Sequence, residues 1–160
     1  MNINACTFIG SRLNRFSFGY DFTAPKCIAL KLQLAQYIND MYKAGVRDFY
    51  SVCQEGVELW AAEIVIYLMA GDDSVKLHCI LPYEEQAARW HPDTRELYYN
   101  ILALASDCEM ISTHYKGYCL ALARYKALDR SCHVFAVVED GSSNEYVKYA
   151  RANGKRVCVL

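Results

Sequence analysis

The sequence has no long apolar run and no excess of charge of either sign. Its longest unbroken apolar stretch, residues 64–70, has seven residues, far short of the roughly 20 that a helix needs to span a bilayer. Seventeen Lys/Arg against eighteen Asp/Glu give a formal net charge of −1, so the chain lacks the broad positive field that binds nucleic acid or an anionic membrane. Residues 1–6 contain neither a basic nor an apolar segment typical of a signal peptide, and we therefore expect a cytoplasmic protein.

Several signatures of common sites are also missing. There is no Gly-x-Gly-x-x-Gly after the first expected strand and no Gly-x-x-x-x-Gly-Lys-Ser/Thr, so ordinary dinucleotide and P-loop binding are not indicated. No Gly-x-Ser-x-Gly nucleophile elbow occurs. Because the eight cysteines form no Cys-x-x-Cys pair and the four histidines no His-x-x-x-His pair, we predict no metal site. Four cysteines lie in short apolar runs and are expected to be buried, reduced thiols: Cys6, Cys53, Cys79 and Cys158.

What the sequence does contain is a regular alternation of strand and helix patterns. The 160 residues fit one domain, and 54% apolar residues suffice for a hydrophobic core. Six expected strands separated by helices predict a Rossmann-like three-layer α/β fold over residues 1–160, with a mostly parallel six-stranded sheet and helices on both faces. The expected strands are 6–9, 49–53, 75–81, 110–113, 133–138 and 156–160. The expected helices run from Pro25 to just before Gly45, over 57–70, 94–106 and 118–130, and from a capping box at Ser142 to Gly154.

The expected topology suggests where a ligand binds. In such sheets the site lies at the carboxyl ends of the strands, where the strand order reverses. The order 3-2-1-4-5-6 would bring Gly10-Ser11-Arg12 beside Thr113-His114-Tyr115. Arg12 and the free N–H groups of helix N-termini would then form an anion site for a phosphate or carboxylate. The alternative interpretation is a simple turn with a solvated Arg12.

Two carboxylates interrupt the otherwise apolar helix 57–70. Glu58 and Glu63 are five residues apart, about 140° around a helix, so they do not act as a pair on one face. Glu58 lies in the first turn, where the helix dipole stabilises an acid whatever its function. Glu63 lies among apolar residues and needs a partner or water. It is either a site residue or a structural acid paired with an arginine.

These segments, taken in order, resemble a known family. Gly56 to Glu63, Gly-Val-Glu-Leu-Trp-Ala-Ala-Glu, is similar to the Gly-Val-(Asp/Glu)-x-Trp-Ala-Ala-Glu segment of the YpsA-like family. That family belongs to the SLOG superfamily of Rossmann-like domains, with DprA and LOG proteins as relatives. Gly10-Ser11-Arg12 resembles its first glycine turn, and residues 82–86 followed by Trp90 resemble its Pro-(Phe/Tyr)-x-x-Gln…Trp stretch. Thr113-His114 and residues 129–131 also have counterparts, so the resemblance spans essentially the whole chain.

The resemblance implies a domain that binds nucleotides or nucleotide derivatives, including ADP-ribose-like ligands, with phosphates held by glycine-rich loops. It implies these ligand-binding residues: Gly10, Ser11, Arg12, Gln54, Gly56, Glu63, Thr113, Ser142, Ser143 and Asn144. This chain departs from the family at three places. Val52-Cys53 replaces Ser-Gly, Ser142-Ser143-Asn144 replaces Gly-Gly-Thr or Ser-Gly-Thr, and Arg124-Tyr125 replaces Arg-Asn. Added Cβ atoms crowd a close-lying phosphate, so we expect a partly altered phosphate site.

We therefore predict a cytoplasmic sensor or adaptor module that binds a nucleotide-like small molecule. One alternative is an enzyme of LOG type that hydrolyses a nucleotide N-glycosidic bond with Glu63 as its catalytic carboxylate, although the Pro-Gly-Gly-x-Gly-Thr-x-x-Glu motif of those enzymes is absent. Another is a protein-interaction or homo-oligomerising domain with a vestigial pocket. Binding to membranes or nucleic acid is disfavoured by the charge.

Overall fold

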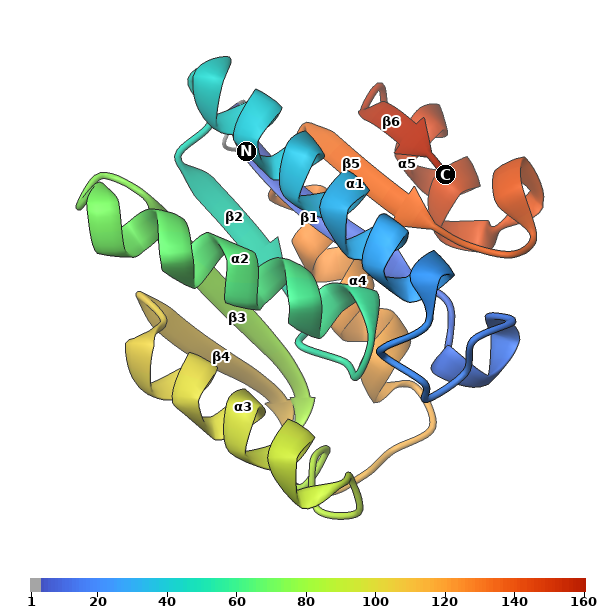
Figure 1. Ribbon diagram of the computed structural model, residues 1–160. Helices are drawn as coiled ribbons and strands as arrows, with labels where there is room; N and C mark the ends of the chain where they lie inside the picture. Colours follow the sequence, from blue (N-terminus) through green and yellow to red (C-terminus); the bar gives the residue numbers. More distant parts are fainter. Residues whose placement is uncertain (1–3) are drawn as a thin grey trace.

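Residues 4–160 of the computed structural model form a six-stranded, all-parallel sheet with α-helices on both faces (Figure 1). This confirms the expected fold class; the expectation for residues 1–6 falls partly on residues 1–3, outside the described part. The strands are β1 (Ala5–Gly10), β2 (Asp48–Ser51), β3 (Lys76–Tyr83), β4 (Asp107–Ser112), β5 (His133–Val137) and β6 (Arg156–Val159). The helices are α1 (Pro25–Lys43), α2 (Val57–Gly71), α3 (Pro92–Leu104), α4 (Cys119–Asp129) and α5 (Glu145–Ala152), with short 3₁₀ turns η1 (Leu13–Arg15) and η2 (Gly141–Ser143).

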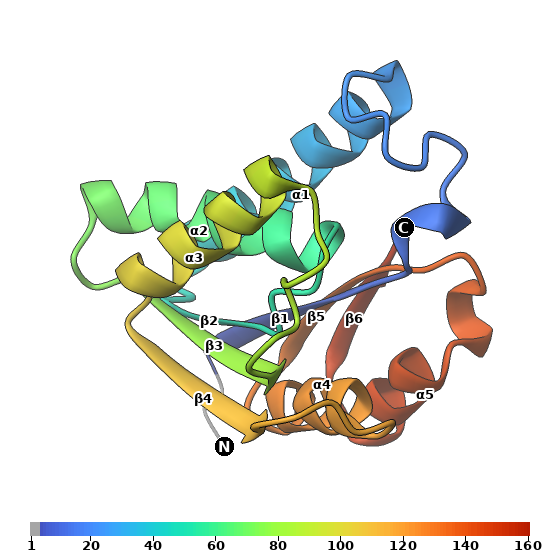
Figure 2. The ribbon, with the colours of Figure 1, turned by 90° about the horizontal axis from the view of Figure 1, so that it is seen from below.

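The strands lie in the order β4-β3-β2-β1-β5-β6, which differs from the expected order. Figure 2 shows α1, α2 and α3 together on one face of the sheet and α4 and α5 on the other. Three successive right-handed crossovers on one face extend the sheet from β1 to β4, and α4 then returns along the opposite face to β5. The strand order therefore reverses between β1 and β5. The expected contact between the ends of β1 and β4 is wrong, because β4 is the far edge strand.

The two helical layers cover separate parts of the core. The larger apolar cluster lies under α1, α2 and α3, and a second cluster lies between β1, β5 and α4 with α5. Helix α2 is buried nearly all round in its first half, as its composition predicts. Cys6, Cys53 and Cys79 are buried as expected, but Cys158 is exposed because β6 is an edge strand.

Helix boundaries follow their caps. Helix α1 begins at Pro25, and Gly45 has the positive φ (100°) expected just after a helix end. The expected capping box at Ser142 is wrong. Asn144 caps α5 instead, accepting hydrogen bonds from the N–H groups of Tyr146 and Val147, since asparagine is among the strongest N-cap residues.

Strand β3 continues through Pro82, where the sequence suggested its end. Strand β2 stops at Ser51, which pairs with Cys79, so β3 has no partner on that side beyond this point. The missing N–H of Pro82 is tolerated there, as on an edge strand. On its other side β3 stays paired with β4 as far as Tyr83. Because β2 is short, the carboxyl edge of the sheet has a step beside Tyr83, and the candidate site lies there.

Candidate functional site

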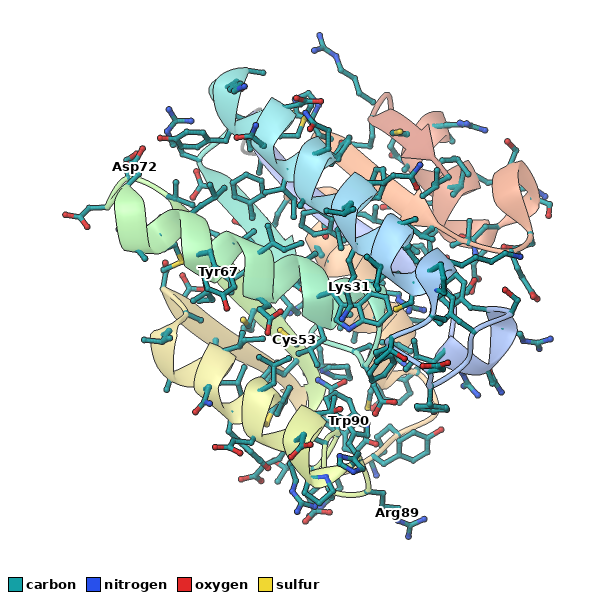
Figure 3. All side chains as sticks on the ribbon, viewed as in Figure 1. Lys31, Cys53, Tyr67, Asp72, Arg89 and Trp90 are labelled. Atoms are coloured by element: carbon teal, nitrogen blue, oxygen red, sulfur yellow. The ribbon has the colours of Figure 1, made fainter. Side chains whose placement is uncertain are left out.

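A cavity of about 460 Å³ opens at this step in the carboxyl edge. Segments far apart in the sequence line it: the β1–α1 connection, the β2–α2 loop, the end of β3 and the N-termini of α4 and α5. Trp90, on the connection from β3 to α3, lies at the same edge (Figure 3). We call this 460 Å³ hollow the main cavity. Its wall includes Arg12, Gln54, Pro82, Tyr83, Gln86, Trp90, Tyr115, Lys116, Gly117, Cys119, Leu120, Ala121, Arg124, Glu145 and Tyr146.

One side of the main cavity is suited to an anion. Helix α4 points its N-terminus at the cavity through Leu120 and Ala121, and its first turn has no acidic residue and no side-chain cap among the described residues. The N–H of Cys119 donates to the carbonyl of Lys116, but those of Leu120 and Ala121 have no hydrogen-bond partner among residues 4–160. These two N–H groups carry the positive end of the helix dipole. Arg12 and Lys116, both exposed, add two positive charges. Together these groups match a phosphate.

The wall of the main cavity also contains aromatic side chains. Tyr83 and Tyr115 meet edge to face with ring centroids 5.3 Å apart, and Trp90 stands edge-on to Tyr98 at the same separation. Aromatic side chains at a cavity wall stack on planar ligands such as nucleobases. The main cavity thus presents both cationic groups and aromatic rings to a ligand.

Two glutamines behave differently in this wall. Gln86 is buried, and its side-chain Nε2 donates to the carbonyl of Val52 at 3.1 Å and to the hydroxyl of Tyr98 at 3.4 Å. Gln54 Oε1 is also buried but accepts no hydrogen bond from residues 4–160. A buried acceptor without a donor is costly. Gln54 therefore offers an unused acceptor to a ligand that carries an N–H or O–H group.

A buried ion pair supports the floor of the main cavity. Glu58 is 1% exposed and Arg124 8% exposed. Arg124 donates to both carboxylate oxygens of Glu58, Nη2 to Oε1 at 2.7 Å and Nε to Oε2 at 3.1 Å, and to the carbonyl of Gly10 at 2.9 Å. Burial disfavours both charges: it raises the pKa of Glu58 and acts to lower the pKa of Arg124. Arg124 opposes that rise, and Glu58 holds the pKa of Arg124 above its ordinary value, so the bidentate geometry describes an ionised pair.

The arginine-paired acid of α2 is thus Glu58, which the sequence attributed to the helix dipole alone. Glu63 is half-buried in a separate hollow of about 180 Å³ that it shares with Lys31 and Trp60. Lys31 lies 4.8 Å from the centre of a Trp60 ring, in the region labelled in Figure 3. Glu63 does not line the main cavity and is not brought to Arg12.

The crevice at the β1–β5 switch point is less suited to a phosphate. It has a volume of about 400 Å³, and three carboxylates face it: Glu139, Asp140 and Glu145. Two cations, Arg12 and Arg15, also line it, but Arg15 is paired with Glu139 at 3.6 Å. The carboxylates disfavour a further anion there.

The predicted serines and asparagine beside this crevice are already engaged. Ser11 Oγ accepts from the N–H of Glu139, and Ser142 Oγ accepts from Arg151. Ser143 Oγ donates to the carbonyl of Asp140, and Asn144 caps α5. These contacts hold the β5–α5 connection in place. They use polar groups that a phosphate-binding loop would offer to its ligand.

The glycines of the predicted site are required by packing and backbone conformation. A Cβ on Gly10 would lie 2.7 Å from Cβ of Val57, so only glycine lets α2 approach β1 this closely. Gly56 has φ 108°, outside the range of most side-chain-bearing residues. Cys53, which stands where the resembled family has glycine, also has a positive φ, 56°. The backbone at this turn is therefore left-handed, although the residue there is a cysteine and not a glycine.

Thr113 is exposed at the end of β4, and its carbonyl accepts a hydrogen bond from Glu84 N–H. It does not line the main cavity, whereas Tyr115, Lys116 and Gly117 just after it do. Sequence reasoning missed Lys116, and it noted Arg124 only as part of an Arg-Asn motif. The available signal was position: a Lys-Gly pair between a parallel strand and the next helix lies where such sheets bind ligands.

The fold and the main cavity define a Rossmann-like α/β protein with a ligand-sized opening at the carboxyl edge of its sheet. A family model described as the YspA SLOG family (YpsA) matches residues 6–156. The chain belongs to this family.

Two relatives illustrate the similarity. A UPF0398 protein of Staphylococcus epidermidis is 30% identical over 123 residues, covering 76% of this chain and 65% of the relative. A UPF0398 protein of Halalkalibacterium halodurans is 35% identical over 89 residues, covering 55% of this chain and 47% of the relative. The matched part therefore spans about half to two thirds of the length of these relatives. Among residues 4–160, no helix has the length and apolar character needed to cross a membrane.

Proposed function

We propose that this chain is a cytoplasmic sensor or adaptor module whose main cavity binds a nucleotide or a nucleotide derivative such as an ADP-ribose-like molecule. The observation that carries the proposal is the pairing, in one cavity, of an uncapped helix N-terminus flanked by two cations with an aromatic wall. A nucleotide has the same two parts, an anion and a planar base.

In this proposal the phosphate binds at the N-terminus of α4 between Arg12 and Lys116. The crevice at the β1–β5 switch point supports this placement by contrast, because three carboxylates line it, and of these only Glu145 also lines the main cavity. Arg12 lines both hollows, so a ligand that extends toward β5 keeps contact with the same cation. The Cβ atoms of Ser142 and Ser143 do not obstruct a phosphate held at α4, because neither residue lines the main cavity.

The base packs in this proposal against Tyr83, Trp90 and Tyr115. A ribose hydroxyl or an amino group of the ligand donates to Gln54 Oε1, which has no donor among the described residues. The hydrolase alternative gains no support, because Glu63, its catalytic carboxylate, lies outside the main cavity.

Isothermal titration with ADP-ribose, NAD and AMP, on the purified chain, tests the proposal. We expect Arg12→Ala and Lys116→Ala each to weaken binding of a phosphate ligand about tenfold or more, the value of one charge-assisted hydrogen bond. Arg15→Ala is the matched control, because Arg15 lies three residues after Arg12 but does not line the main cavity. Equal affinities in all four proteins, or no binding by the unmodified chain at millimolar ligand, would refute the proposed site.

A further inference from the structure

Three cysteines from different parts of the sequence meet beneath α3. Cys79 on β3 is the register partner of Cys108 on β4, and its sulfur also lies 3.5 Å from that of Cys53 in the β2–α2 loop. Cys53 is labelled in Figure 3 near the middle of the sheet's carboxyl side. Cys53 and Cys79 are fully buried, whereas Cys108 is exposed on the edge strand. The cluster thus leads from the surface into the core.

The groups around Cys108 act on its thiol in opposite directions: its Sγ donates to the carbonyl of Leu102 at 3.8 Å, which favours the thiol, whereas Cys79 favours the thiolate. A hydrogen bond from the Cys79 thiol lowers the pKa of Cys108 to about 7, although partial burial and the neighbouring Asp107 act in the opposite direction. The same bond and burial keep Cys79 protonated, since they raise its pKa far above the ordinary value. Toward each other, Cys79 is therefore the proton donor and Cys108 the acceptor. The thiolate is the reactive form of cysteine.

We propose that Cys108 is a modification site for hydroperoxides and that Cys79 is the thiol that resolves the oxidised product into a Cys79–Cys108 disulfide. The inference does not depend on the proposed nucleotide site. Adjacent strands are spaced about 4.7–4.9 Å apart, which falls within the roughly 4.4–6.8 Å between Cα atoms that a disulfide needs. Register partners on neighbouring strands are therefore close enough to be joined.

The reaction has two balanced steps. The Cys108 thiolate attacks one peroxide oxygen, so that an S–O bond forms and the O–O bond breaks; the sulfur loses two electrons, and the departing hydroxide or alkoxide takes up a proton. The Cys79 sulfur then attacks the Cys108 sulfenic acid, forming the S–S bond and breaking the S–O bond. The thiol proton of Cys79 leaves with the hydroxyl as water. With hydrogen peroxide, two thiols and one peroxide give one disulfide and two waters.

The first experiment treats the native full chain with one equivalent of hydrogen peroxide and maps its cysteines by peptide mass spectrometry under non-reducing conditions. We expect a Cys79–Cys108 crosslink with Cys158, the other exposed strand cysteine, unmodified. The proposal is wrong if Cys158 is oxidised as fast as Cys108. It is also wrong if Cys108 advances to the sulfinic acid without a crosslink to Cys79.

The second experiment measures the pH dependence of Cys108 alkylation by iodoacetamide in Cys79→Ala. Loss of the hydrogen bond should raise the pH midpoint by about 1.5 units, toward that of a free thiol. At pH 7 the rate should fall only about threefold, because a more basic thiolate is also more nucleophilic. Cys158→Ala serves as the control and should leave the midpoint unchanged. An unchanged midpoint in Cys79→Ala, with native circular dichroism, would show that Cys79 does not activate Cys108.

Discussion

Replacing Arg124 with methionine would leave the Glu58 carboxylate buried without its counter-ion. Both groups lie almost entirely out of solvent, so the pair is not screened as a surface pair would be. Removing one partner of such a pair costs about 3–5 kcal/mol of unfolding free energy. For a chain of this size the loss corresponds to a melting temperature lower by roughly 10 °C.

A matched variant separates burial from geometry. Arg130 also meets a carboxylate, that of Glu109, at an even shorter 2.6 Å, but its side chain is 42% exposed. Arg130→Met should therefore cost only about 0–1 kcal/mol. If distance rather than desolvation controlled the energy, Arg130→Met would cost as much as Arg124→Met.

The single variant Glu58→Met leaves Arg124 buried without its counter-ion and should also cost about 3–5 kcal/mol. The double variant Glu58→Met/Arg124→Met completes the cycle. It removes both charges and should cost about 1–3 kcal/mol, chiefly because the Gly10 carbonyl loses its buried donor. Its cost is then well below the sum of the two single variants. Urea unfolding followed by tryptophan fluorescence measures all four proteins. Additive costs, or a single Arg124→Met cost below 1 kcal/mol, would refute a coupled, buried ion pair.

Two further predictions concern packing and pH. Gly10→Ala places a Cβ 2.7 Å from that of Val57 and should lower the unfolding free energy by about 1–3 kcal/mol, whereas Gly71→Ala, with nothing within 4 Å, should be neutral or slightly stabilising in thermal denaturation. Hydrogen bonds from Ser74 lower the pKa of Asp72 to about 2, so its carboxylate stabilises the fold above about pH 4 and that contribution disappears as the pH falls toward 2. The urea midpoint of Asp72→Asn should accordingly change less with pH over this interval than that of the unmodified chain, and parallel pH profiles would contradict the assignment.

Local sequence patterns predicted the elements themselves well. Pro25 and Gly45 marked the two ends of α1, and the apolar composition of α2 indicated a covered helix; the structure agrees with each. These features depend on backbone geometry and on burial of one contiguous segment, so neighbouring residues suffice to specify them. The family followed from the same local segments, above all Gly56 to Glu63.

Relations between distant segments could not be predicted in this way. Asn144 and Ser142 are both good caps, and the tertiary position of the β5–α5 connection selected Asn144. Glu58 and Glu63 are similar acids on one helix, and only the approach of α4 decided that Glu58 meets an arginine.

The sequence by itself determined the α/β class, the succession of elements and the family, because these depend on periodicity, turn residues and a contiguous motif. The tertiary structure alone decided the strand order, the step beside β2 and the main cavity. Each of these depends on which face of the sheet a connecting helix covers and on the residue at which a strand stops pairing with its neighbour. Those choices are settled by contacts between residues such as Gly10 and Arg124, more than 100 positions apart, and no local pattern encodes such a separation.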